Sequence, residues 1–82
     1  MEYDYDNEKM IKSIKTKLEF YKEQGNSVHV LFNNISRTTF YNGEILSICE
    51  DKFIINDKKF GHSMVLLQDI KVLERYTESK NA

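Results

Sequence analysis

The sequence of 82 residues contains no proline, no tryptophan, three glycines and a single cysteine, Cys49. One cysteine cannot form an internal disulfide, which excludes the small secreted domains that disulfides hold together. No apolar run has the length of a membrane span, and no secretory signal opens the chain. We therefore expect one small cytoplasmic domain that makes no contact with a membrane.

Charge is unevenly distributed, although 12 basic residues nearly balance 13 acidic ones. Residues 1–8 hold four acids and no base, whereas residues 9–22 hold five lysines and a single acid. A basic helix surface attracts phosphate groups. A solvated helix surface explains the same lysines more simply, since lysine is common at solvent-facing helix positions.

A helical pattern opens the chain. Apolar residues recur at spacings of three and four from Met10 to Tyr21, which predicts a helix over 7–24. Asn7 is suited to cap its start, and Gly25 is suited to end it in a left-handed conformation.

The rest of the chain consists of short strand patterns. Apolar alternation and β-branched runs predict strands at five positions, which are 27–33, 39–49, 52–57, 62–67 and 71–75. We expect these strands to form a barrel over 26–76. Residues 1–6 are expected to be a disordered acidic tip, and residues 77–82 a flexible tail.

Two features of the strands go beyond this outline. Gly43 lies inside the second strand pattern, where a glycine marks a bend or the close approach of another backbone. The runs 53–55 and 64–67 are apolar on both faces of their strands, and a small barrel has only one inside. We therefore expect a second copy of the chain to cover residues near the last two strands, which are Met64, Val65, Leu66, Leu67, Val72 and Leu73.

The order and content of these segments resemble the Sm-like family, which includes bacterial Hfq. The resemblance covers residues 7–76 and rests on a helix followed by three strand segments and a turn. These are the run Val28, Val30 and Phe32, the run Tyr41, Gly43 and Ile45, the segment 51–55, and the turn 67–70. The family implies a strongly bent five-stranded antiparallel barrel of SH3-like type. It also implies closed homo-oligomeric rings, from pentamer to heptamer, in which the fourth strand of one subunit pairs with the fifth of the next.

The family further implies single-stranded RNA binding at a central pore. Carried over by position, Lys52 and Phe53 lie on the loop before the third strand, and Gln68 lies on the turn after the fourth. Phe53 would stack on a base, Gln68 would bind a base edge, and Lys52 would meet a base or a phosphate. A core position for Phe53 and a turn-capping role for Gln68 are the competing structural interpretations.

Lysines would add a second RNA contact. Lys9, Lys12 and Lys15 lie on or beside the polar side of the expected helix, where the subunits of a ring would combine them into a basic annulus. Lys71 partly replaces the Arg-Gly pair that Sm and archaeal members carry in the last turn.

A second hypothesis is a structural or protein-interaction module with the same fold and no nucleic-acid binding. The missing Arg-Gly pair and the nearly neutral barrel favour it, whereas the basic helix and the segment 51–53 favour RNA. No nucleophile motif, phosphate-binding glycine loop or metal-ligand spacing is present. We therefore expect a protein that is not an enzyme and needs neither cofactor nor metal.

Overall fold

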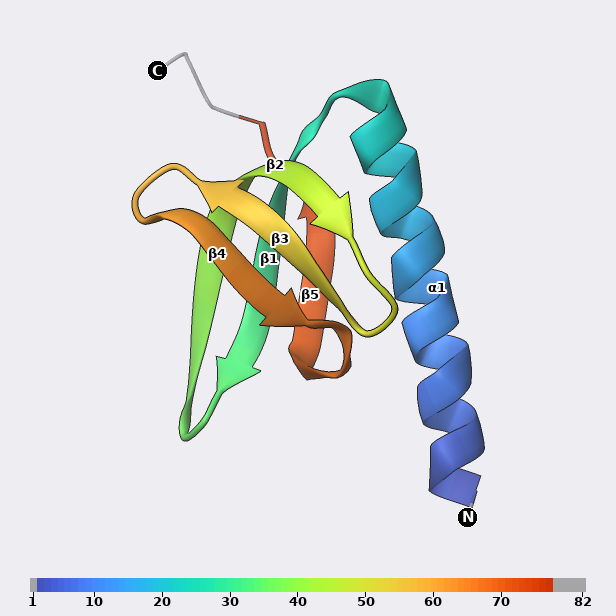
Figure 1. The fold of residues 1–82 in the computed structure, drawn as a ribbon. Helices are drawn as coiled ribbons and strands as arrows, with labels where there is room; N and C mark the ends of the chain where they lie inside the picture. The colour runs from blue at the N-terminus through green and yellow to red at the C-terminus, as the bar shows by residue number, and fades with distance from the viewer. Residues whose placement is uncertain (1, 78–82) are drawn as a thin grey trace.

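The computed structural model describes residues 2–77. Its elements in chain order are the helix α1 (Glu2–Gln24), β1 (Ser27–Asn34), β2 (Arg37–Ile48), β3 (Lys52–Asp57), β4 (Gly61–Leu66), the 3₁₀ turn η1 (Leu67–Asp69) and β5 (Ile70–Arg75) (Figure 1). The expected fold class, a helix followed by a five-stranded antiparallel sheet, is confirmed. Each strand begins and ends within two residues of its predicted limits.

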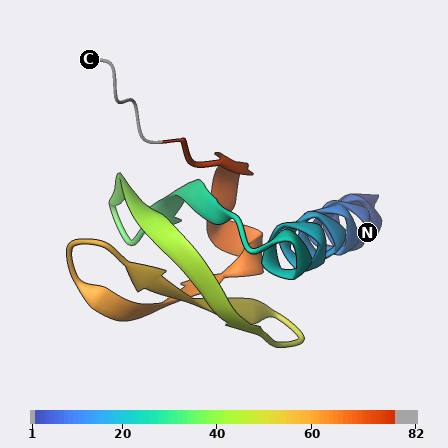
Figure 2. The ribbon, with the colours of Figure 1, turned by 90° about the horizontal axis from the view of Figure 1, so that it is seen from above.

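The strands form one sheet in the order β4-β3-β2-β1-β5, with every neighbouring pair antiparallel. The long strand β2 curves, so that β3 and β4 fold over β1 and β5 in a second layer (Figure 2). β4 and β5 are the two edges of this sheet. An edge strand leaves backbone N–H and C=O groups available for pairing, which makes both edges relevant to assembly.

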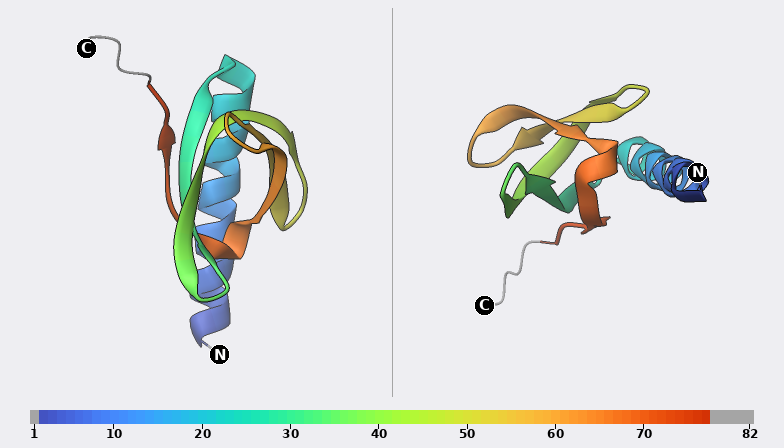
Figure 3. Two further views of the ribbon diagram at one scale, coloured as in Figure 1. Left: turned by 90° about the vertical axis from the view of Figure 1, so that its left-hand side faces the viewer. Right: turned by 90° about the horizontal axis from the view of Figure 1, so that it is seen from below.

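Helix α1 lies along one side of the folded sheet, and its N-terminal turns extend past the strands (Figure 3). Leu18 is fully buried, and Ile11, Ile14 and Tyr21 pack partly against the same core, which explains the apolar spacing of three and four. Gly25 ends the helix at φ 73°. There the Gly25 amide donates to the Lys22 carbonyl at 3.1 Å, and the Asn26 amide donates to the Tyr21 carbonyl at 3.0 Å.

The predicted start of the helix is wrong. Residues 2–6 continue the helix instead of forming a disordered tip, and the absence of proline and glycine between 2 and 24 permits this extension. Met1 and residues 78–82, which belong to the predicted tip and tail, lie outside the described residues.

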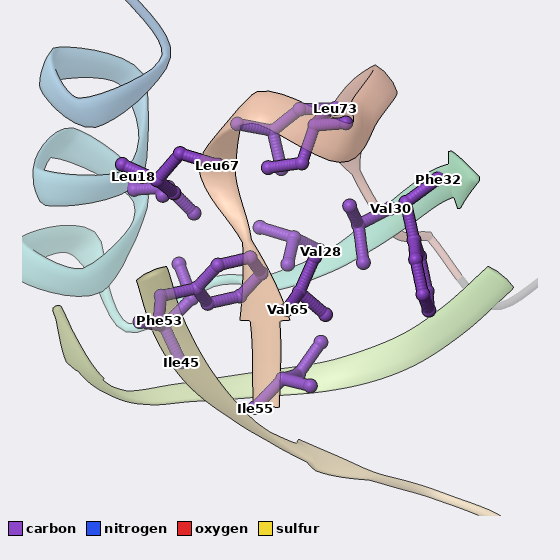
Figure 4. Packing of buried hydrophobic residues seen from close by; sticks show 11 residues of the cluster. Leu18, Val28, Val30, Phe32, Ile45, Phe53, Ile55, Val65, Leu67 and Leu73 are labelled. Carbon is purple, nitrogen blue, oxygen red and sulfur yellow. The ribbon is translucent and has the colours of Figure 1, made fainter. Parts of the chain in front are cut away.

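The core fills the space between the two layers and the helix. It is made of eleven buried apolar side chains, and Figure 4 shows them converging from α1, from η1 and from the five strands (Figure 4). β1 illustrates the pattern, since Val28, Val30 and Phe32 point inward while the residues between them are only partly buried.

Gly43 is held between two strands by register, opposite Val28 on β1 and Asp57 on β3. A Cβ at Gly43 would overlap the backbone carbonyl oxygen of Asn56. The close backbone approach expected from the sequence is therefore present. The register irregularity of β2 lies a little further on, between Ile45 and Ser47.

The β1–β2 connection is tighter than the loop expected between 33 and 39. The two strands pair as far as Asn34 and Arg37, which leaves Ile35 and Ser36 as a two-residue turn. Ile35 has φ 55° and is 98% exposed. A β-branched residue rarely adopts this left-handed conformation, so the turn carries local strain.

Asp57 is a buried carboxylate that fixes the β3–β4 turn to β2. Its Oδ1 accepts from the Asn42 amide at 2.8 Å, and its Oδ2 accepts from the amides of Lys59 at 2.9 Å and Phe60 at 2.8 Å. Burial by itself raises the pKa of Asp57. The three amide hydrogen bonds and the charge of Lys59 outweigh that effect, so the pKa lies below its ordinary value.

Candidate nucleic-acid interface

The two turns assigned to RNA lie side by side. The Leu67 amide of η1 donates to the Asp51 carbonyl of the β2–β3 turn at 2.9 Å, and Lys52 is paired with Leu66 across β3 and β4. Both turns lie at the end of the sheet that faces α1 (Figure 1). The structure therefore brings Lys52 and Gln68 to one end of the domain, as the family resemblance implies.

The side chains at this end differ in how far a ligand can reach them. Gln68 is exposed on η1, and Lys52 is partly exposed, with its Nζ 3.6 Å from Asp51 Oδ1. Phe53 is 0% exposed and belongs to the core. The stacking role predicted for Phe53 is wrong, because a base cannot stack on a ring that the fold encloses. The competing core interpretation is correct.

The lysines of α1 lie beside the β2–β3 turn. Lys9, Lys12 and Lys15 line an open groove of about 570 Å³ between α1 and the β2–β3 turn. Ile11 also lines it, and two acids, Glu8 and Glu50, complete it. The helix side of the groove thus carries three lysines and one carboxylate, and the turn adds a second carboxylate.

Lys71 lies elsewhere. It lines a smaller groove of about 240 Å³ on another side of α1, together with Met10 and Lys17. Lys17 Nζ donates to the Leu73 carbonyl at 2.9 Å, which ties the helix to β5. The seven side chains predicted to contact RNA therefore do not form one surface. Five of them, Lys9, Lys12, Lys15, Lys52 and Gln68, lie on or beside the two turns.

The residues predicted to form the oligomer interface fall into a buried group and an exposed group. Val65 and Leu67 are 1% and 0% exposed, and Leu73 is buried with them in the core of the chain. Their assignment to an interface is wrong, because inward alternation along the strands directs them to the core. Met64 on β4 and Val72 on β5 are 53% and 39% exposed, and Leu66 is partly exposed.

Glu50 is the residue of this region that sequence reasoning missed. Next to Asp51 it fits an ordinary turn acid, and nothing in the local sequence indicates a helix residue far along the chain as its neighbour. Only the docking of α1 against β2 brings Glu50 to the lysines.

Among the described residues, no three His, Cys, Asp or Glu side chains gather closely enough to hold a metal ion. No helix within residues 2–77 combines the length and apolar character that a membrane span requires. The sequence matches no protein-family model and no curated protein.

Proposed function

We propose that this chain is an Sm-like protein that assembles into a closed ring and binds single-stranded RNA where the β2–β3 turn, η1 and α1 meet. One observation carries the proposal. A single bent sheet in the order β4-β3-β2-β1-β5 leaves two different edges unpaired, and each edge presents an exposed apolar side chain, Met64 on one and Val72 on the other.

Ring closure follows from the difference between these edges. An antiparallel pairing of β4 with β5 of the next subunit is a heterologous contact, and such contacts close into a ring when the rotation per subunit permits. The pairing would satisfy the open backbone groups of both edges and would remove Met64 and Val72 from water. A small domain with a modest core gains stability from such burial.

RNA binding is supported by the chemistry gathered at one end of each subunit. Lys12 and Lys15 provide positive charge for phosphates, which sets affinity without reading sequence. Gln68 provides an amide that can donate to and accept from a base edge. In a ring, every subunit would repeat this set around the same axis.

The test is a binding titration with short single-stranded oligo-U, oligo-A and DNA of equal length. Replacing Lys12 and Lys15 by alanine should weaken all three ligands alike. It should also flatten the salt dependence by about 0.7 in log–log slope for each phosphate that the variant no longer neutralises. The matched control replaces Lys58 and Lys59, two exposed lysines of the β3–β4 turn, and removes the same charge elsewhere. An equal decrease in affinity for both double variants would reject a specific role for the helix lysines.

Gln68 tests the base-reading part of the proposal. Gln68→Ala should change the ranking of the three ligands while leaving the salt dependence intact, because it removes a base contact and no charge. A wild-type protein that binds no oligonucleotide at low salt would favour the alternative function, an Sm-fold module that binds only proteins. The acids in the groove and the Asp51–Lys52 pair are the observations that favour that alternative.

A further inference from the structure

The groove beside α1 holds charges of both signs, with lysines and Glu8 on the helix and Glu50 on the turn. Lys12 and Lys15 come from the helix, Glu50 comes from the β2–β3 turn, and Ile11 provides the apolar part of the lining. Its volume of about 570 Å³ falls within the range of small-ligand sites, about 300–1,000 Å³. A ligand that fits this lining must carry an anion, an apolar surface and a hydrogen-bond donor.

These charged groups are available to a ligand. Among the residues that the structure describes, Lys12, Lys15 and Glu50 form no ion pair with one another or with a neighbour. Lys12 and Glu50 are exposed and Lys15 is half-buried, so a bound molecule can reach all three. Each of the three can therefore form a hydrogen bond with a solute in the groove.

A nucleotide combines the three required features. Its phosphate can contact the ammonium groups, and its ring can lie against Ile11. The carboxylate of Glu50 is only an acceptor, so it selects bases that present donors. Cytosine and adenine carry an exocyclic amino group that donates to a carboxylate. Uracil has a carbonyl oxygen in place of the cytosine amino group, and its N3–H donor lies between two carbonyl oxygens that repel Glu50.

We infer that this groove reads single nucleotides of the bound strand, and that Glu50 selects bases with an exocyclic amino group against uracil. The inference rests on the proposed function, and it adds a base preference to it. Lys12 and Lys15 then raise the affinity for every nucleotide, whereas Glu50 changes only the difference in affinity between bases.

The experiment measures the affinity of wild type for oligo-A, oligo-C and oligo-U of equal length at one low salt concentration. Wild type should bind oligo-A and oligo-C more tightly than oligo-U, on the order of fivefold or more, since a hydrogen bond to a charged acceptor is at stake. Glu50→Gln should raise the affinity for oligo-U and bring the three affinities close together, because the glutamine amide can donate to uracil carbonyls.

Glu74→Gln is the matched control, since Glu74 is an exposed acid on β5 outside the residues that line the groove. It makes the same change in charge and should leave the ratio between oligo-C and oligo-U unchanged. Equal affinities of wild type for all three ligands, or a ratio that Glu50→Gln does not alter, would overturn the inference and leave RNA binding itself in place. Absence of any binding at low salt would overturn the proposed function and the inference together.

Discussion

The side of β4, η1 and β5 that faces the core and the side that faces outward carry similar apolar residues. The inner residues are buried and the outer residues are exposed. Val65 and Leu67 are packed among the buried side chains of the core, as Figure 4 shows (Figure 4). Met64 and Val72 come from the same short segments and remain substantially exposed. The inner set is buried by the chain itself, so only the outer set is accessible at the surface.

This difference teaches how a doubly apolar strand should be interpreted. The run 64–67 is apolar on both faces of its strand, but alternation alone does not say which face the chain covers with its own core. The fold assigns one face to its own core. An interface variant must therefore be placed on the other face, or it reports on folding instead of assembly.

The largest expected effect comes from a charge on the inner side. Leu67→Asp places an unpaired carboxylate in the core and should cost about 4 kcal/mol or more, which approaches the whole stability of a small domain. Thermal unfolding followed by circular dichroism should lose its cooperative transition. Met64→Asp, the matched outer variant, should keep the fold. An unchanged melting temperature for Leu67→Asp would contradict the inward assignment.

A substitution at Gly43 tests the close packing of the β2 backbone against the β3 backbone. Gly43→Val should destabilise the domain by about 1–3 kcal/mol, because its Cβ meets the Asn56 carbonyl and β3 must move away. Chemical denaturation measures the change in the free energy of unfolding. Glu44→Val alters the next residue, whose side chain is exposed, and should change stability by less than about 0.5 kcal/mol. Similar destabilisation of the two variants would show that the close approach at Gly43 is unimportant.

A substitution at Asp57 extends the test of buried positions from apolar side chains to a buried carboxylate. Asp57→Asn replaces one acceptor oxygen by an NH₂ group and should lower the free energy of unfolding by about 1–3 kcal/mol. The pKa of Asp57 is lowered in the folded state, so its contribution is present above the ordinary pKa and is lost as the pH falls through the folded value.

Wild type should therefore lose stability as the pH falls below about 4, and Asp57→Asn should lose less over the same interval. Urea denaturation at a series of pH values measures both curves. Parallel curves for wild type and variant would mean that other carboxylates produce the acid sensitivity.

The smallest expected effect lies at the β1–β2 turn. Ile35→Gly should stabilise the domain by about 0.5–1 kcal/mol, because glycine adopts positive φ without the strain that isoleucine carries, even after its larger loss of backbone entropy. Ser36→Gly should bring no such gain, since its φ is not positive. A destabilised Ile35→Gly variant would show that the exposed side chain makes a contact that stabilises the fold, such as one with another subunit.

Most of the fold could be predicted because it depends on local patterns. Alternation locates the strands, the spacing of three and four locates the helix, and Gly25 marks its end. The start of the helix could not be placed, since acidic residues and tyrosines neither require nor forbid it.

The candidate site was less predictable, because it depends on contacts between distant segments. Lys52 and Gln68 come together through strand pairing that the family resemblance already implies. Phe53 could not be assigned from its position next to a turn, because one step along a strand separates an exposed residue from a buried one. Glu50 reaches the helix lysines only through tertiary packing, which no local pattern records.

The most direct test of ring assembly is the mass of the intact protein at micromolar concentration, by native mass spectrometry or light scattering. Wild type should give a single species from pentamer to heptamer of the 9.7 kDa subunit, and the outer double variant Met64→Lys with Val72→Lys should give a folded monomer. A wild-type mass of one subunit, 9.7 kDa, would contradict the account.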